Sequence, residues 1–117
     1  MTADQIKPLI VAALEELKAF NIVTLDVSAQ TSITDLMIIA SGRSSRQVKA
    51  IAEKVLETAK TANVPVLGTE GQEQAEWILV DLGDVIVHIM HPTTRSYYQL
   101  EKLWDTSDKS LGATSQQ

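Results

Sequence analysis

Apolar residues recur at helical spacing in two segments of the chain. The first segment spans residues 4–19 and carries Ile6, Leu9, Ile10, Ala13, Leu14 and Leu17. The second begins after Ser44, which has Gln47 three positions later, ends near Asn63, and carries Val48, Ile51, Ala52, Val55, Leu56 and Ala59. Since positions i, i+3, i+4 and i+7 share one side of an α-helix, the pattern predicts two amphipathic helices, the second opened by a capping box.

Shorter runs between and after these helices have the composition of β-strands. Residues 22–28 alternate and are rich in β-branched side chains, whereas residues 36–40 form a continuous apolar run, which is typical of a central strand buried on both faces. Residues 66–68 predict another strand, so that strand, helix and strand form one right-handed unit. Residues 92–94 then open a last helix, with a predicted packing stripe of Tyr97, Leu100 and Trp104.

The clearest hairpin signal lies in residues 76–90. Two β-rich runs flank Gly83-Asp84, a two-residue loop with glycine where a positive φ is required. Such a loop fixes the register, so residues paired across it point to the same side. One face is then aliphatic and consists of Ile78, Val80, Leu82, Val85, Val87 and Ile89. The other face is mixed and consists of Trp77, Leu79, Asp81, Ile86, His88 and Met90.

The aliphatic face is predicted to be core, but the mixed face has two interpretations. It is either a second buried face beneath a helix, in which His88 and Asp81 satisfy each other or the backbone, or an open face that binds a partner. Tryptophan and methionine are enriched at interfaces, and exposed apolar patches mark binding sites. The sequence therefore indicates a candidate binding face without deciding how open it is.

The elements follow in the order α-β-β-α-β-β-β-α. This order predicts an α/β fold, a single domain with one mixed sheet of about five strands and flanking helices. We expect the domain to span residues 1–104. Residues 105–117 are rich in Ser, Thr, Gln and Gly and poor in apolar side chains, so we expect them to form a flexible C-terminal tail.

Charge is distributed unevenly along the chain. The 117 residues carry 10 basic and 15 acidic side chains, a net charge of −5. No lysine or arginine lies between Lys60 and Arg95, whereas that interval contains Glu70, Glu73, Glu76, Asp81 and Asp84. Because nucleic-acid binding depends on basic side chains that neutralise phosphates, this distribution argues against nucleic-acid specificity and favours a basic protein partner. With no cysteine, targeting pattern or membrane-length apolar run, we expect a cytoplasmic protein.

The sequence lacks arrangements that support catalysis. The turn at residues 41–46 holds Arg43 and Arg46 and could bind an anion, but it lacks the spacing of a phosphate-binding loop, and helix capping explains it more simply. The sequence has two pairs of potential metal ligands, Asp81 with Asp84 and His88 with His91. The two residues of each pair are three positions apart, so their side chains diverge and cannot readily share one metal ion. We therefore predict no enzyme activity, no metal and no cofactor.

Two motifs lie toward the C-terminus, Trp-x-x-x-Asp-x-Gly-Asp at residues 77–84 and Leu-x-x-Leu-Trp at residues 100–104. With residues 26–27, 31–35 and 41–46 upstream, they closely resemble the ribosomal silencing factor (Iojap) family over roughly residues 6–104. The chain departs from the family pattern at His91-Pro92-Thr93-Thr94 and in its tail.

This resemblance implies a nucleotidyltransferase-like fold without catalytic residues. It also implies binding to protein fourteen of the large ribosomal subunit, a block on joining of the small subunit, and repression of translation when nutrients are short; some family members form homodimers. The implied partner-binding residues are Trp77, Asp81, Leu82, Gly83, Asp84, His88, Met90 and Tyr98. Leu103 and Trp104 also match. The alternatives are a nucleotide-binding or nucleotidyltransferase-like enzyme, and a dimeric adaptor.

Overall fold

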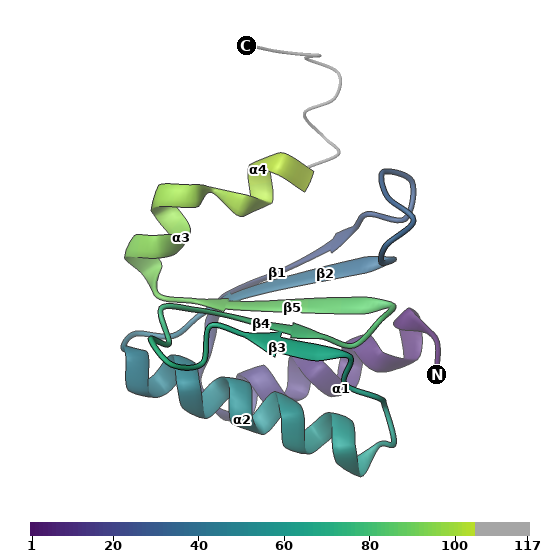
Figure 1. Cartoon of the computed structure of the whole chain (residues 1–117), viewed down its shortest axis with the longest axis horizontal. Helices are drawn as coiled ribbons and strands as arrows, with labels where there is room; N and C mark the ends of the chain where they lie inside the picture. Colours follow the sequence, from purple (N-terminus) through teal and green to yellow (C-terminus); the bar gives the residue numbers. More distant parts are fainter. Residues whose placement is uncertain (105–117) are drawn as a thin grey trace.

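A five-stranded β-sheet forms the middle of the molecule, with two long helices on one face and two short helices on the other (Figure 1). The computed structural model describes residues 1–104, and of Trp104 the backbone alone. The helices are α1 (Ala3–Glu16), α2 (Ser45–Thr61), α3 (Pro92–Tyr98) and α4 (Leu100–Trp104). The strands are β1 (Phe20–Asp26), β2 (Leu36–Ser41), β3 (Gly68–Glu70), β4 (Trp77–Asp81) and β5 (Val85–Met90). Within residues 1–104, no helix combines the length and apolar character needed to cross a membrane.

The strand order is β1-β2-β5-β4-β3, which confirms the predicted mixed sheet. The central strands β2 and β5 are parallel, whereas the β1–β2, β5–β4 and β4–β3 pairs are antiparallel. The strands that precede and follow α2 in the sequence, β2 and β3, are therefore parallel, but β5 and β4 lie between them in the sheet. The prediction of a strand at residues 66–68 was two residues early, because Val66 and Leu67 lie in the exposed connection from α2 to the sheet edge.

Both long helices end in a residue with left-handed backbone. After α1 this residue is Lys18 (φ 65°), and the N–H groups of residues 18 and 19 donate to carbonyls of the last turn at 3.0 and 2.9 Å. After α2 the same role falls to Asn63 (φ 60°). This Schellman arrangement pairs carbonyls that the helix leaves open. The first helix consequently ends earlier than the predicted 4–19, because the left-handed backbone at Lys18 ends it.

The hairpin of β4 and β5 has the predicted register, from Trp77 opposite Met90 to Asp81 opposite Ile86. Its turn uses the positive φ of Gly83 (85°), as expected. All six residues of the aliphatic face are buried in the main core, together with the apolar stripes of α1 and α2. Each fully buried aliphatic side chain stabilises the fold by roughly 1.5–3 kcal/mol, so this face holds the hairpin in place.

The predicted last helix is two helices. Gln99 has left-handed backbone (φ 49°, ψ 51°) and ends α3, after which α4 begins (Figure 1). The predicted packing stripe is therefore wrong, since the break changes which side chains face the sheet. Leu100 is buried, whereas Tyr97 is 80% exposed, and the side chain of Trp104 lies outside the described part of the structure.

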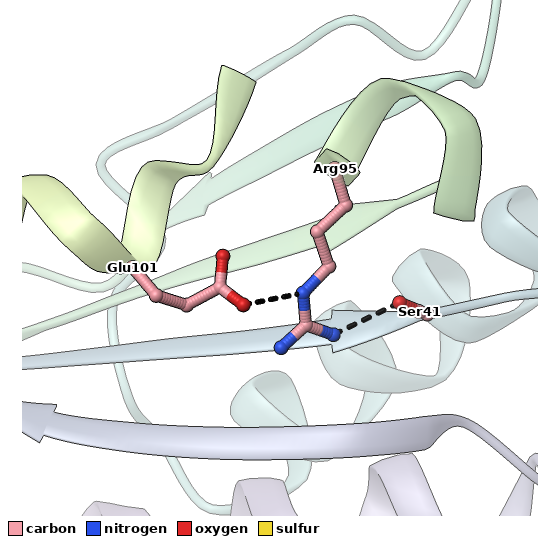
Figure 2. Close-up of polar contacts among 3 residues, drawn as sticks. All are labelled: Ser41, Arg95 and Glu101. Carbon is pink, nitrogen blue, oxygen red and sulfur yellow. Dashed lines mark hydrogen bonds and ion pairs between the residues drawn. The ribbon is translucent and has the colours of Figure 1, made fainter. Parts of the chain in front are cut away.

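Arg95 ties the two short helices to the sheet (Figure 2). From α3, its Nε donates to Glu101 Oε2 on α4 at 2.9 Å, and its Nη1 donates to Ser41 Oγ at the end of β2 at 2.9 Å. Both Arg95 and Ser41 are buried. A buried charge must be paired and hydrogen-bonded to be tolerated, so this connection determines where α3 and α4 lie over the sheet.

Candidate partner-binding site

The mixed face of the hairpin contains a polar pair at its Trp77 end. The indole Nε1 of Trp77 donates to His88 Nδ1 at 2.9 Å. His88 is 5% exposed, and burial lowers the pKa of its imidazole to about 4. The ring is therefore neutral at pH 7, with Nδ1 as acceptor and its proton on Nε2. Asp81, which the sequence offered as a partner for His88, takes no part in this bond.

Three of the eight predicted partner-binding residues are buried. Met90 is fully buried in a second apolar cluster between the sheet and α4, with Val27, Met37, Ile39 and Leu100. His88 lies beneath Trp77, and Leu82 belongs to the main core. None of the three side chains offers surface to a partner in this structure. Their geometry instead supports a role in positioning the exposed residues around them. Of the two interpretations of the mixed face, the buried one holds for His88 and Met90.

The exposed part of this end is aromatic. Trp77 is half-buried, and its ring centroid lies 5.0 Å from that of Tyr98, at an interplanar angle of 50°. Tyr98 in turn meets Tyr97 edge-to-face at 4.9 Å. Tyr98 is 54% exposed. Aromatic side chains held this way offer a large contact area and lose little conformational entropy on binding, so they suit an interface.

A cleft of about 530 Å³ opens beside these rings, between α3 and the loop that joins β3 to β4. Its walls include Glu73, Glu76, Trp77, Thr94, Tyr97 and Tyr98. The loop is held firmly. Ala75 is buried in the core, the carbonyl of Glu76 accepts from His91 N at 2.9 Å, and Gly71 has φ +87°. A Cβ on Gly71 would lie 2.0 Å from the Trp77 carbonyl oxygen, so only glycine fits there.

The turn of the hairpin forms a separate group. One Asp81 carboxylate oxygen accepts from Gly83 N at 2.8 Å, and the Asp84 carbonyl accepts from the N–H groups of Asp35 and Leu36, each at 3.1 Å. The turn is thereby fixed to the start of β2. The side chain of Asp84 remains exposed.

The predicted site residues thus fall at the two ends of β4 rather than in one cluster. One end carries Trp77 and Tyr98 over His88 and Met90, and the other carries the turn with Asp81, Leu82, Gly83 and Asp84. Trp77 and Leu82 are five residues apart, about 16 Å at the rise of an extended strand. A single partner would need to contact the whole length of β4 to reach both groups.

Over residues 1–117 the sequence matches the family described as "Ribosomal silencing factor during starvation". The chain belongs to the ribosomal silencing factor family. A relative with that name from Haemophilus influenzae is 52% identical over 91 residues, 78% of this chain and 89% of the relative. A crystal structure of a Chromobacterium violaceum protein is 48% identical with a TM-score of 0.88, covering 90% of this chain and 88% of that one. Mouse "mitochondrial assembly of ribosomal large subunit protein 1" is 33% identical over 99 residues, 82% of this chain and 43% of the mouse protein.

In this member of the silencing factor family, the arginine-bearing turn caps a helix. Ser44 Oγ accepts from Gln47 N at 3.1 Å, and the Gln47 side chain accepts from Arg43 N. Both arginines are exposed. Among residues 1–104, no three His, Cys, Asp or Glu side chains come together as a metal site would require.

The roles of two residues at this end of the silencing factor, Tyr97 and Arg95, could not be recognised from the sequence. Tyr97 was assigned to a packing stripe, and the only signal against it was the capacity of Gln99 to end the helix, which a single glutamine does not reveal. Arg95 was noted only as the end of a gap in basic residues. Its serine and glutamate partners lie 54 and 6 positions away, so no local pattern connects them.

Proposed function

We propose that this chain represses translation by binding protein fourteen of the large ribosomal subunit and blocking the joining of the small subunit when nutrients are limiting. The action is steric and involves no catalysis. The observation that carries the proposal is the surface formed by Trp77, Tyr98 and their acidic surroundings, in a chain that belongs to a family of ribosomal silencing factors. The name of the mouse relative, which specifies the large subunit, supports the choice of subunit.

The charge of this surface suits a ribosomal partner. Proteins that lie on ribosomal RNA are rich in basic side chains, which neutralise phosphates. The exposed Glu70, Glu73, Glu76 and Asp84 would attract such a protein, while the aromatic rings supply contact area that excludes water. Exposed aromatic rings with Glu73 and Glu76 beside them, and Asp84 at the far end of β4, therefore support a basic protein partner.

The dimensions of the molecule support a steric mechanism. The principal-axis extents are 40 × 32 × 21 Å. Contacts between two ribosomal subunits require atoms to approach within about 4 Å, so a body of this thickness at the joining surface would prevent them from forming. Bound protein alone is sufficient, and no reaction is needed.

The proposal is tested by adding the full chain to purified large subunits and then supplying small subunits. We expect it to co-sediment with large subunits and to reduce the yield of joined ribosomes in proportion to its occupancy. Large subunits stripped of protein fourteen should no longer retain it. Normal joining at full occupancy would refute the steric mechanism, and unchanged retention on the stripped subunits would refute the assigned partner.

Tyr98→Ala should lower affinity for the large subunit by about 2 kcal/mol, the range of an interface hot spot. Tyr98 is the better position to test than Trp77, because it is mostly exposed whereas the Trp77 indole holds His88. Affinity is measured by quantitative co-sedimentation and folding by circular dichroism. Lys49→Ala on the exposed side of α2 is the matched control and should change neither. Wild-type affinity of a folded Tyr98→Ala chain would remove Tyr98 from the interface.

Raising the salt concentration should slow association more than it hastens dissociation. Charges at the edge of an interface steer the encounter and are screened beyond about 10 Å at 0.1 M salt. Between 50 and 500 mM salt we expect the association rate constant to fall roughly tenfold, measured by stopped-flow fluorescence. An association rate constant that does not vary with salt would show that the acidic side chains named above do not steer the encounter.

A further inference from the structure

Three aromatic side chains of the described residues line one cleft. The sequence contains two tryptophans, two tyrosines and one phenylalanine, and the cleft beside α3 takes Trp77, Tyr97 and Tyr98. Tyr97 is 80% exposed, although its neighbour Arg95 is buried on the sheet side of the same helix. Exposing both tyrosines on one wall leaves aromatic surface in water, an arrangement that marks a binding site.

The opposite wall of this cleft is acidic. Glu73 and Glu76 belong to the β3–β4 loop and are both exposed. Within the described residues neither forms a salt bridge, and the sequence contains no lysine or arginine from residue 61 to residue 94. Positive charge from outside the described residues 1–104 is therefore the natural complement of these carboxylates.

From these observations we infer that the cleft binds the guanidinium group of an arginine side chain on the protein partner. The inference rests on the proposed function and deepens it by naming the chemistry of the contact. The guanidinium lies over the aromatic rings, which attract cations through their π faces, and donates to the carboxylates of Glu73 and Glu76. The volume of about 530 Å³ accommodates such a side chain.

The arrangement favours guanidinium over other groups. A phosphate is repelled by the two carboxylates and finds no cation among the described residues that line the cleft. A lysine ammonium satisfies the charge but is strongly hydrated and cannot stack, whereas planar guanidinium stacks on aromatic rings and donates to carboxylates at once. The anchored loop keeps the acidic wall in place before binding, which reduces the ordering that binding requires.

The chemistry is tested with blocked amino acids and the full chain. N-acetyl-arginine N-methylamide is titrated while the indole N–H signal of Trp77 and the amide signals of residues 97 and 98 are followed by NMR. N-acetyl-citrulline N-methylamide is the matched neutral probe, and the corresponding lysine compound tests the preference for guanidinium. We expect saturable shifts with arginine, binding about tenfold weaker with citrulline, and weaker binding with lysine. Equal binding of arginine and citrulline, or saturable shifts confined to other residues, would overturn the inference, and equal binding of lysine would overturn the guanidinium assignment.

Variants of the acidic wall connect this result to the ribosome. The double variant Glu73→Gln/Glu76→Gln should bind the arginine probe and the large subunit at least about fivefold more weakly, whereas Glu53→Gln on the exposed side of α2 should change neither. If the wild-type chain binds large subunits and the double variant binds them equally well, the cleft inference fails while the proposed function stands. If the wild-type chain does not bind large subunits, the proposed function fails. The arginine that occupies the cleft would then not come from a ribosomal protein.

Discussion

Lowering the pH from 6.5 to 4 should reduce the free energy of unfolding by about 3 kcal/mol through His88 alone. The folded imidazole has its pKa lowered from 6.5 to about 4 by burial, so the unfolded chain binds a proton across this window and the folded chain does not. The contribution is fully present above pH 6.5, is lost as the pH falls toward 4, and is constant below that value. The difference of about 2.5 pKa units corresponds to about 3 kcal/mol.

The surroundings of His88 explain why protonation is costly. Its partners across the sheet, Ile39 on β2 and Leu79 on β4, are apolar and provide no carboxylate. Protonation would also place a second donor against the Trp77 N–H, so the indole bond would be lost.

His88→Gln isolates this contribution from the carboxylates that titrate in the same range. The glutamine amide oxygen can accept from Trp77 Nε1 but carries no titratable proton. Urea unfolding from pH 4 to 7.5 should therefore show a pH dependence that is weaker in the variant by about 3 kcal/mol. Identical pH dependences would mean that the imidazole is hydrated or protonated in the folded chain, contrary to the structure.

Arg95→Met should lower the free energy of unfolding by about 2–3 kcal/mol. The substitution keeps most of the side-chain volume but leaves Glu101 without its cation, and breaking a buried ion pair from one side typically costs ~3–5 kcal/mol. The lower figure follows because the Glu101 side chain is 31% exposed and recovers some hydration. Ser41 Oγ also loses its donor.

A double-mutant cycle tests whether the loss comes from the ion pair. Arg95→Met/Glu101→Met removes both charges, so it should be more stable than Arg95→Met alone, and the coupling between the two positions should exceed about 1 kcal/mol in denaturant unfolding. Additive single substitutions would show that the pair contributes no more than packing. Because α3 carries Tyr97 and Tyr98, Arg95→Met should also weaken the proposed binding to the large subunit.

The hairpin shows how much of this fold the sequence specifies. Its register follows from a two-residue loop with glycine at a positive φ, and each step of that inference is local, so Trp77 opposite Met90 could be predicted without a structure. The aliphatic face could be predicted in the same way, because six aliphatic residues on one face have no stable place except the core.

Non-local features could not be predicted in the same way. The insertion of β5 between β2 and β4 depends on which strand edges meet after the chain has folded back. The sequence pattern of β2 is equally compatible with β3 or β5 as its parallel neighbour. The mixed face remained ambiguous because its burial depends on α3 and α4, whose position depends on Arg95 reaching Ser41 across the chain. The sequence therefore predicts Trp77 and Tyr98 together with His88 and Met90 as one group, and could not show that the first two are at least partly exposed whereas the other two are buried.

The parallel pairing of β2 with β5 sets a lower limit on how soon a newly synthesised chain can complete its sheet. Leu36 pairs with Val85, so the partners are 49 residues apart (85 minus 36). At a synthesis rate of about 5–20 residues per second, the ribosome needs roughly 2 to 10 seconds to make that interval. Until then β2, apolar on both faces, lacks its central partner and is exposed to aggregation. Each new molecule therefore begins to restrain ribosomes only after a delay set by its own topology.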